Sequence, residues 1–126
     1  MALLEQYLTT EMLENYLGDP FDSNSLFSFE RAVEIDECEE YPHEFVDLVN
    51  AWNFHHYYIP KEYGGKFQSF EELLSLERTF LRRELSLVSA HGVTYLGALP
   101  VWIGGTIRQK MQLAERIKNR DLISFG

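Results

Sequence analysis

Histidines, a single cysteine and a dense run of acids are the side chains of this sequence that could do chemistry. His55 and His56 are adjacent, and adjacent side chains diverge on any regular element, so this pair cannot chelate one metal ion. Cys38 lies among acids, whose negative charge disfavours the reactive thiolate form. The acids from Glu34 to Glu40 include no histidine at helical spacing, and we interpret them as a solvated face. We therefore predict no metal site in this chain and no activated cysteine.

The stretch from Leu81 to Ile103 is the part of the chain that the other elements must surround. It becomes uncharged from Leu85 onward, and an uncharged helix in a soluble domain is normally wrapped by other elements. Gly92 and Gly97 each cost about 1 kcal/mol relative to alanine in an exposed helix, so we expect a helix or a ligand to pack closely there. Two interpretations stay open: a central core helix, or one wall of a buried apolar slot.

Length and composition restrict the class of protein. A chain of 126 residues with 45% hydrophobic residues fits one domain with a sizeable core and argues against intrinsic disorder. No apolar run is long enough to span a bilayer, and the N-terminus lacks the basic region of a secretory signal. The single cysteine rules out an intrachain disulfide and fits a reducing, cytoplasmic location.

The net charge of −9 is distributed unevenly along the chain. Residues 1–65 hold 14 acids and two bases, whereas residues 66–126 hold nine bases and six acids. The acidic half should repel nucleic acid, so we expect no nucleic-acid partner. The bases of the second half, including Arg82 and Arg83, could meet an anionic group, although basic side chains on helix faces are usually only solvated. The glycine pairs at 64–65 and 104–105 lack the strand and the spacing of a phosphate-binding loop.

Hydrophobic spacing predicts an all-α domain of about six helices. Ser28 is a predicted N-cap, and Ser69 and Thr106 each begin a capping box, with Glu72 and Gln109. The predicted helices are residues 1–17, 29–40 and 42–52, a helix from residue 70 to residue 84, the central helix capped by Ser86, and a last helix that ends near Asn119.

Three further details complete the expected secondary structure. We expect Pro100 to begin a separate short turn through Ile103, because proline is disfavoured inside a helix. Residues 57–60 and 121–126 are expected to be extended. On the helix that begins at Phe70, only Glu77 and Glu84 interrupt the apolar face.

The sequence from Ser28 to Gly126 resembles the N-terminal helical domain of the flavin-dependent acyl-CoA dehydrogenases. The resemblance depends on several short stretches in a fixed order and at fixed spacing. They are Tyr58–Gly65, Ser69 with Glu72, Arg82–Ser86, Leu96–Pro100, and Gly105–Thr106 with Gln109–Lys110. Residues 1–27, a helix and a linker, precede this region, so we expect two units, 1–27 and 28–126.

The resemblance implies that a full enzyme adds a middle β-barrel and a C-terminal helical bundle. FAD would lie between these two domains and a neighbouring subunit, so the full enzyme would be a homo-oligomer. Its reaction would be α,β-desaturation of an acyl thioester carried on CoA or on an acyl carrier protein. The catalytic glutamate would lie in the C-terminal bundle, so we expect residues 1–126 alone to be inactive.

The resemblance also implies site residues within this chain. Phe125 matches an aromatic position that contacts the flavin. The acyl slot would be lined by Val88, Gly92, Val93, Tyr95 and Leu96. The missing side chain of Gly92 would deepen the slot, which predicts a medium or long acyl chain.

His91 lies beside these positions and could either face the slot or pack in the core. The alternative function is a non-enzymatic helical module. In that case the acidic half, the Arg82–Arg83 pair and the apolar slot would form a docking surface for an acyl carrier or another partner protein. We also expect Trp102, Ile123 and Phe125 to be exposed, which would favour self-association.

Overall fold

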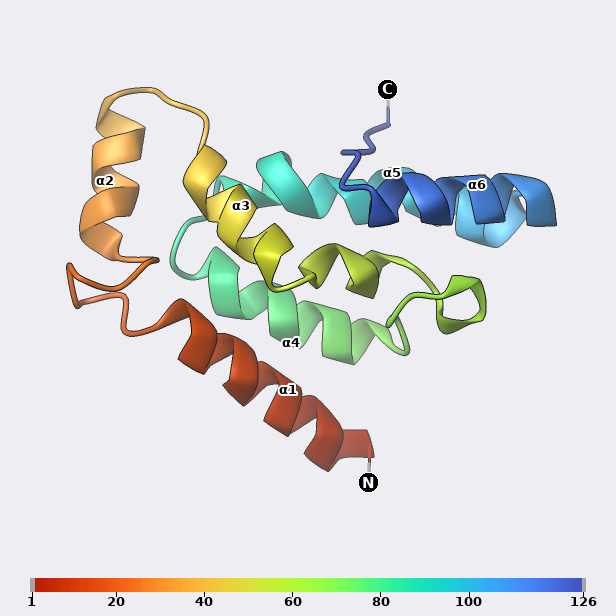
Figure 1. The fold of residues 1–126 in the computed structure, drawn as a ribbon, viewed down its shortest axis with the longest axis horizontal. Helices are drawn as coiled ribbons and strands as arrows, with labels where there is room; N and C mark the ends of the chain where they lie inside the picture. Colours follow the sequence, from red (N-terminus) through yellow and green to blue (C-terminus); the bar gives the residue numbers. More distant parts are fainter. Residues whose placement is uncertain (1, 126) are drawn as a thin grey trace.

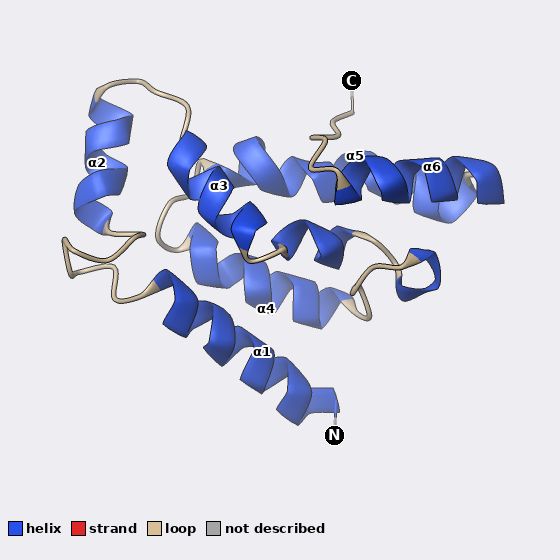
Figure 2. Cartoon of the chain, viewed as in Figure 1, coloured by secondary structure: helices blue, strands red, loops and turns tan. Residues whose placement is uncertain are grey.

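The computed structural model describes residues 2–125 as six α-helices and three shorter helical turns, with no strand in that range (Figure 2). Met1 and Gly126, the outermost residues of the two expected units, lie outside the described residues. The helices are α1 (Ala2–Leu17), α2 (Phe29–Glu37), α3 (His43–Ala51), α4 (Phe70–Leu81), α5 (Val93–Gly104) and α6 (Ile107–Lys118). Two 3-10 turns, η1 (Phe54–Tyr58) and η2 (Lys61–Tyr63), and one π-helical turn, η3 (Val88–Gly92), complete the fold. The all-α prediction is confirmed.

Side-chain caps begin three of the helices at the residues that the sequence indicates. The Ser28 hydroxyl accepts a hydrogen bond from the Arg31 amide (3.2 Å), which starts α2. The Ser69 hydroxyl likewise accepts from the Glu72 amide at the start of α4. At α6 the capping box is reciprocal, because the Gln109 side chain also accepts from the Thr106 amide (2.8 Å).

The helices are arranged in tiers (Figure 1). α1 packs along α4, and α5 with α6 forms the tier on the other side of α4 and η1. The core between them is rich in aromatic rings, with Phe54 packed edge-to-face on Phe80 at a centroid distance of 4.8 Å. Leu13, Leu17 and Phe27 are fully buried in the same core, so α1 and the segment that follows it contribute side chains to that core.

The sequence prediction is wrong at both ends of the central helix. Ser86 does not cap it, because the helix begins with η3, whose N-cap residue Leu87 makes no side-chain cap. Pro100 does not begin a separate turn, because α5 runs through it to Gly104. The residues beyond the proline are held by tertiary contacts that offset its cost of roughly 3 kcal/mol: the Trp102 indole N–H donates to the Tyr58 carbonyl (3.0 Å) and its ring stacks on Tyr63.

Two smaller differences concern the first half of the chain. α2 ends at Glu37, three residues earlier than expected, and Glu39 adopts a positive φ of 53°. Tyr57 and Tyr58 belong to η1, and the extended backbone expected there begins only at Ile59 (φ −112°, ψ 124°). None of the helices within residues 2–125 is long and apolar enough to cross a bilayer.

Candidate functional site

An apolar groove of about 170 Å³ runs between α4 and the central helix formed by η3 and α5. Except for one carboxyl group and one phenol, its lining carries no polar side chain. The lining residues are Phe70, Leu73, Leu74, Glu77 and Leu81 from α4 and Val88, Gly92, Tyr95, Leu96 and Leu99 from the central helix. The volume is smaller than the 300 Å³ or more typical of a complete small-molecule site, so this groove is one wall of a larger cavity or a short slot.

Four of the five residues predicted to line a slot lie together in this groove: Val88, Gly92, Tyr95 and Leu96. Val88 and Leu96 are 40% and 50% exposed, so their apolar side chains are accessible to a ligand. The fifth residue, Val93, is only half-buried but is not part of the lining. The central helix is therefore both core and groove wall, because Ala90 and Ala98, which are outside the lining, are buried in the core.

Phe125 is separated from the groove, in the segment that follows α6. Its side chain is 68% exposed, whereas Trp102 and Ile123, which we also expected to be exposed, are partly buried against the core. Exposed apolar side chains also lie at the other end of this tier, where α5 meets α6: Ile103 and Ile107 are 76% and 71% exposed.

The two central glycines have different close neighbours. A Cβ atom at Gly97 would lie 3.0 Å from backbone atoms of Ser124 and from Ile123, so this glycine allows the C-terminal segment to pack on α5. A Cβ atom at Gly92 would lie 3.4 Å from Oε1 of Glu77. The missing side chain of Gly92 therefore leaves the Glu77 carboxyl group open to the groove.

Glu77 is the ionisable acid of this groove and is not among the site residues expected from the sequence. Burial raises the pKa of its carboxyl group to about 7, and no hydrogen bond or nearby charge opposes that shift. The pKa of the Tyr95 phenol is also raised, first by burial and second by the negative charge of Glu77. The signal in the sequence was the interruption of an apolar helix face by a glutamate.

His91 faces the core and not the groove, which decides between the two interpretations left open. It is 1% exposed, and its Nε2 lies 2.9 Å from Oδ1 of Asn50 while its Nδ1 lies 2.8 Å from the Tyr58 hydroxyl. Because Oδ1 can only accept, Nε2 carries the proton and Nδ1 accepts from Tyr58. Burial, with a smaller contribution from His55, lowers the pKa of His91 to about 4, so the ring is neutral at physiological pH.

The arginine pair is engaged by α1. Glu14 forms ion pairs with both Arg82 and Arg83, and the Arg83 guanidinium (side chain 2% exposed) also donates to the Gly18 carbonyl at 2.9 Å. A third contact of Arg83 is to the carbonyl of Thr79. These contacts make Arg83 a buried link between α1 and α4 rather than a free cationic site.

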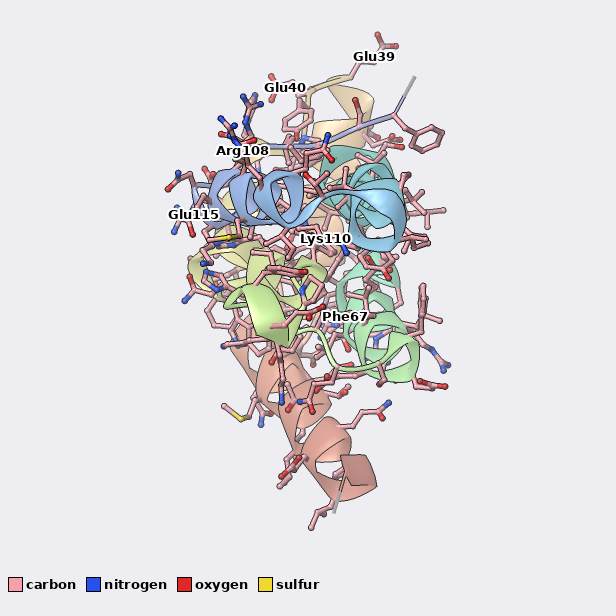
Figure 3. All side chains as sticks on the ribbon, turned by 90° about the vertical axis from the view of Figure 1, so that its right-hand side faces the viewer. Glu39, Glu40, Phe67, Arg108, Lys110 and Glu115 are labelled. Carbon is pink, nitrogen blue, oxygen red and sulfur yellow. The ribbon has the colours of Figure 1, made fainter. Side chains whose placement is uncertain are left out.

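The other chemistry-bearing residues are dispersed. Glu39 and Glu40 are exposed at the rim of the molecule and point away from its body (Figure 3). His55 is buried and its pKa is lowered to about 4, chiefly by burial. Across residues 2–125, no group of three or more His, Cys, Asp or Glu side chains is placed to hold a metal ion.

A larger hollow of about 870 Å³ lies at the far end of α5, where α5 meets α6. Its lining includes Pro100, Met111 and Arg116 but none of the predicted site residues. The groove beside Gly92 is the better candidate, because it combines an apolar lining with a half-buried carboxyl group whose pKa is raised.

Comparison with known families gives one match. The family model described as "Acyl-CoA dehydrogenase, N-terminal domain" matches residues 28–120. No curated protein and no solved structure matches the chain. The match covers most of the chain, from the start of α2 to the end of α6.

Proposed function

Because the chain belongs to the acyl-CoA dehydrogenase N-terminal domain family, we propose that it is the acyl-lining domain of a flavin-dependent oxidoreductase. That enzyme desaturates an acyl thioester, on CoA or on an acyl carrier protein, at its α,β bond. The observation that carries the proposal is the groove between α4 and α5, which gathers Val88, Gly92, Tyr95 and Leu96 around one apolar space. In this proposal residues 1–126 alone are inactive, because the catalytic glutamate belongs to the C-terminal bundle of the full enzyme.

The chemistry of the groove suits an alkyl chain. Each methylene group that leaves water for an apolar lining contributes about 0.8 kcal/mol. Leu96 and Val88 provide accessible apolar surface, and Gly92 leaves space beside them. The modest volume, about 170 Å³, is consistent with a domain that supplies one wall while other domains complete the cavity.

The flavin would meet this chain only at its edge. Phe125 is an exposed aromatic ring that could stack on a flavin ring, and this fits the proposed contact. One aromatic residue cannot hold a dinucleotide, so the remaining contacts belong to other domains. The flavin supplies the hydride acceptor, which protein side chains cannot provide.

The alternative, a non-enzymatic docking module for an acyl carrier or partner protein, has less support. Its docking surface requires a free arginine pair, whereas Arg82 and Arg83 are both paired with Glu14. We further propose that the whole enzyme is a cytoplasmic homo-oligomer, with the exposed Ile103, Ile107 and Phe125 covered by other domains or subunits.

A change at Gly92 tests the proposal. In the full-length natural protein, Gly92→Phe should shift the preferred acyl chain from medium or long toward short, because the ring fills the groove. The measurement is flavin reduction by butanoyl, octanoyl and palmitoyl thioesters, with a flavin spectrum of residues 1–126 in parallel. Ser89→Phe is the control, since Ser89 is exposed and outside the lining. An unchanged chain preference in Gly92→Phe, or an active 1–126 fragment, would contradict the proposal.

A further inference from the structure

We propose that Glu77 is a specificity-determining residue of the groove and selects acyl chains that carry a hydrogen-bond donor, a hydroxyl or an amino group. This inference rests on the proposed function of the groove and adds the chemical class of the acyl chain. An unsubstituted alkyl chain would bind less well, because it gives the carboxyl group no partner.

The position of Glu77 is the first support. It lies on α4 between Leu74 and Leu81, with apolar side chains on either side of it along the groove. Across the groove it faces Gly92, where a Cβ atom would lie 3.4 Å from Oε1. A side chain at position 92 would therefore cover the carboxyl group, whereas glycine leaves it accessible to a ligand in the groove.

The lack of an internal partner is the second support. Among the ion pairs of residues 2–125 none involves Glu77, and burial is the sole cause of its shifted pKa. Glu14, by contrast, is paired with Arg83. The Glu77 side chain is only half-buried, so a carboxyl group without an internal ion pair can accept a hydrogen bond from a ligand in the groove.

The carboxyl group of Glu77 also predicts how strongly the groove discriminates between acyl chains with and without a hydrogen-bond donor. A site that holds a buried hydrogen-bonding group rejects ligands that leave this group unpaired much more strongly than it distinguishes ligands by one methylene group. Tyr95 lies in the same lining, and its phenol offers a second polar contact to such a substituent. We expect a donor-bearing chain to bind at least tenfold more tightly than the plain chain.

Three probes test the inference: the N-acetylcysteamine thioesters of octanoate, 8-hydroxyoctanoate and 8-aminooctanoate. Binding to the chain of residues 1–126 is measured by titration in ¹H–¹⁵N spectra, with the amide signals of Gly92 and Leu96 reporting the groove. Wild type should bind the two donor-bearing probes at least tenfold more tightly than the octanoyl probe. Glu77→Leu should abolish this preference, and its apolar side chain suits the groove, so folding is preserved.

Two further variants sharpen the test. Glu77→Gln keeps an acceptor oxygen but loses the charge, so it should retain the preference for the hydroxyl probe and lose that for the amino probe. Glu71→Leu, an exposed position on the same helix and outside the lining, should bind like wild type. Equal affinities of wild type for all three probes would overturn this inference and leave the proposed function standing. Failure of every probe to perturb Gly92 and Leu96 would overturn the proposed function and this inference together.

Discussion

His91 joins three elements, because its ring contacts Tyr58 from η1 and Asn50 from α3 while its own backbone lies in η3. Its pKa of about 4 lies below the ordinary value of 6.5. Between these two pH values the unfolded chain binds a proton that the folded chain excludes. The free energy of unfolding therefore falls as pH decreases from 6.5 to 4 and levels off below, by about 3 kcal/mol at most for this group.

The prediction for His91 is a ring that stays neutral, with its proton on Nε2, down to a pH near 4. Histidine ¹⁵N spectra recorded against pH measure both the titration and the tautomer. Urea unfolding at several pH values gives the sign of the change in the free energy of unfolding. Glu77 acts in the opposite direction to His91, because its raised pKa of about 7 makes the free energy of unfolding fall as pH rises. The Glu77→Gln variant removes this opposing contribution. A ring that titrates near 6.5 would contradict the buried network.

The contacts of His91 show why some hydrogen bonds can be predicted from the sequence and others cannot. The caps at Ser28, Ser69 and Thr106 use donors three residues away, so their patterns are visible in the sequence. Asn50 lies 41 residues from His91, and no local pattern indicates that contact. Glu77 is an intermediate case, because its interruption of an apolar face is visible but the groove that it faces is not.

The central helix is also predicted only where its structure depends on local sequence. Its length and its lack of charge are visible in the sequence, and four of the five expected lining residues share one groove. Its π-helical start and its continuation through Pro100 are not visible, because they depend on contacts with distant elements such as the hydrogen bond from Trp102 to Tyr58. Local propensity is a weak prior where tertiary packing opposes it.

Two glycines of α5 provide a matched pair for a stability test. At Gly97 a side chain would meet Ile123 and Ser124 at 3.0 Å, so Gly97→Val should displace the C-terminal segment and cost about 1–3 kcal/mol, the range for overpacking. At Gly104 a Cβ atom would meet nothing within 4 Å, so Gly104→Ala should stabilise by about 0.5–1 kcal/mol.

Urea unfolding measures both changes, and limited proteolysis reports whether residues 121–125 detach in Gly97→Val. This segment carries Phe125, so its displacement would also move the proposed flavin contact. Equal effects of the two substitutions would show that close packing at Gly97 is not what holds the segment.

At the scale of the whole molecule, residues before position 28 pack in the same core as the residues that follow. The family match begins at residue 28, yet Leu13, Leu17 and Phe27 are fully buried in the common core. Glu14 also provides the charge that neutralises the buried Arg83. α1 lies outside the recognisable motifs of the family, and its packing on α4 is a long-range property of the fold.

Removal of residues 1–27 should therefore unfold the remainder of the chain. Each of the three buried side chains contributes about 1.5–3 kcal/mol, and an unpaired buried Arg83 costs about 3–5 kcal/mol. Together these losses approach the whole stability of a typical domain, about 5–15 kcal/mol. Circular dichroism of residues 28–126 on heating should show no cooperative transition.

Single substitutions keep that prediction testable if the truncated chain aggregates. Glu14→Gln should lower the free energy of unfolding by about 2–4 kcal/mol, because Glu14 is partly exposed and the loss is smaller than for a fully buried pair. Glu115→Gln removes an exposed pair with Lys118, and should cost less than about 1 kcal/mol. Glu115 lies on the outer side of α6 (Figure 3). The prediction would be contradicted if residues 28–126 showed a cooperative transition near the wild-type midpoint and the two substitutions had equal effects. In that case α1 would not be needed for folding.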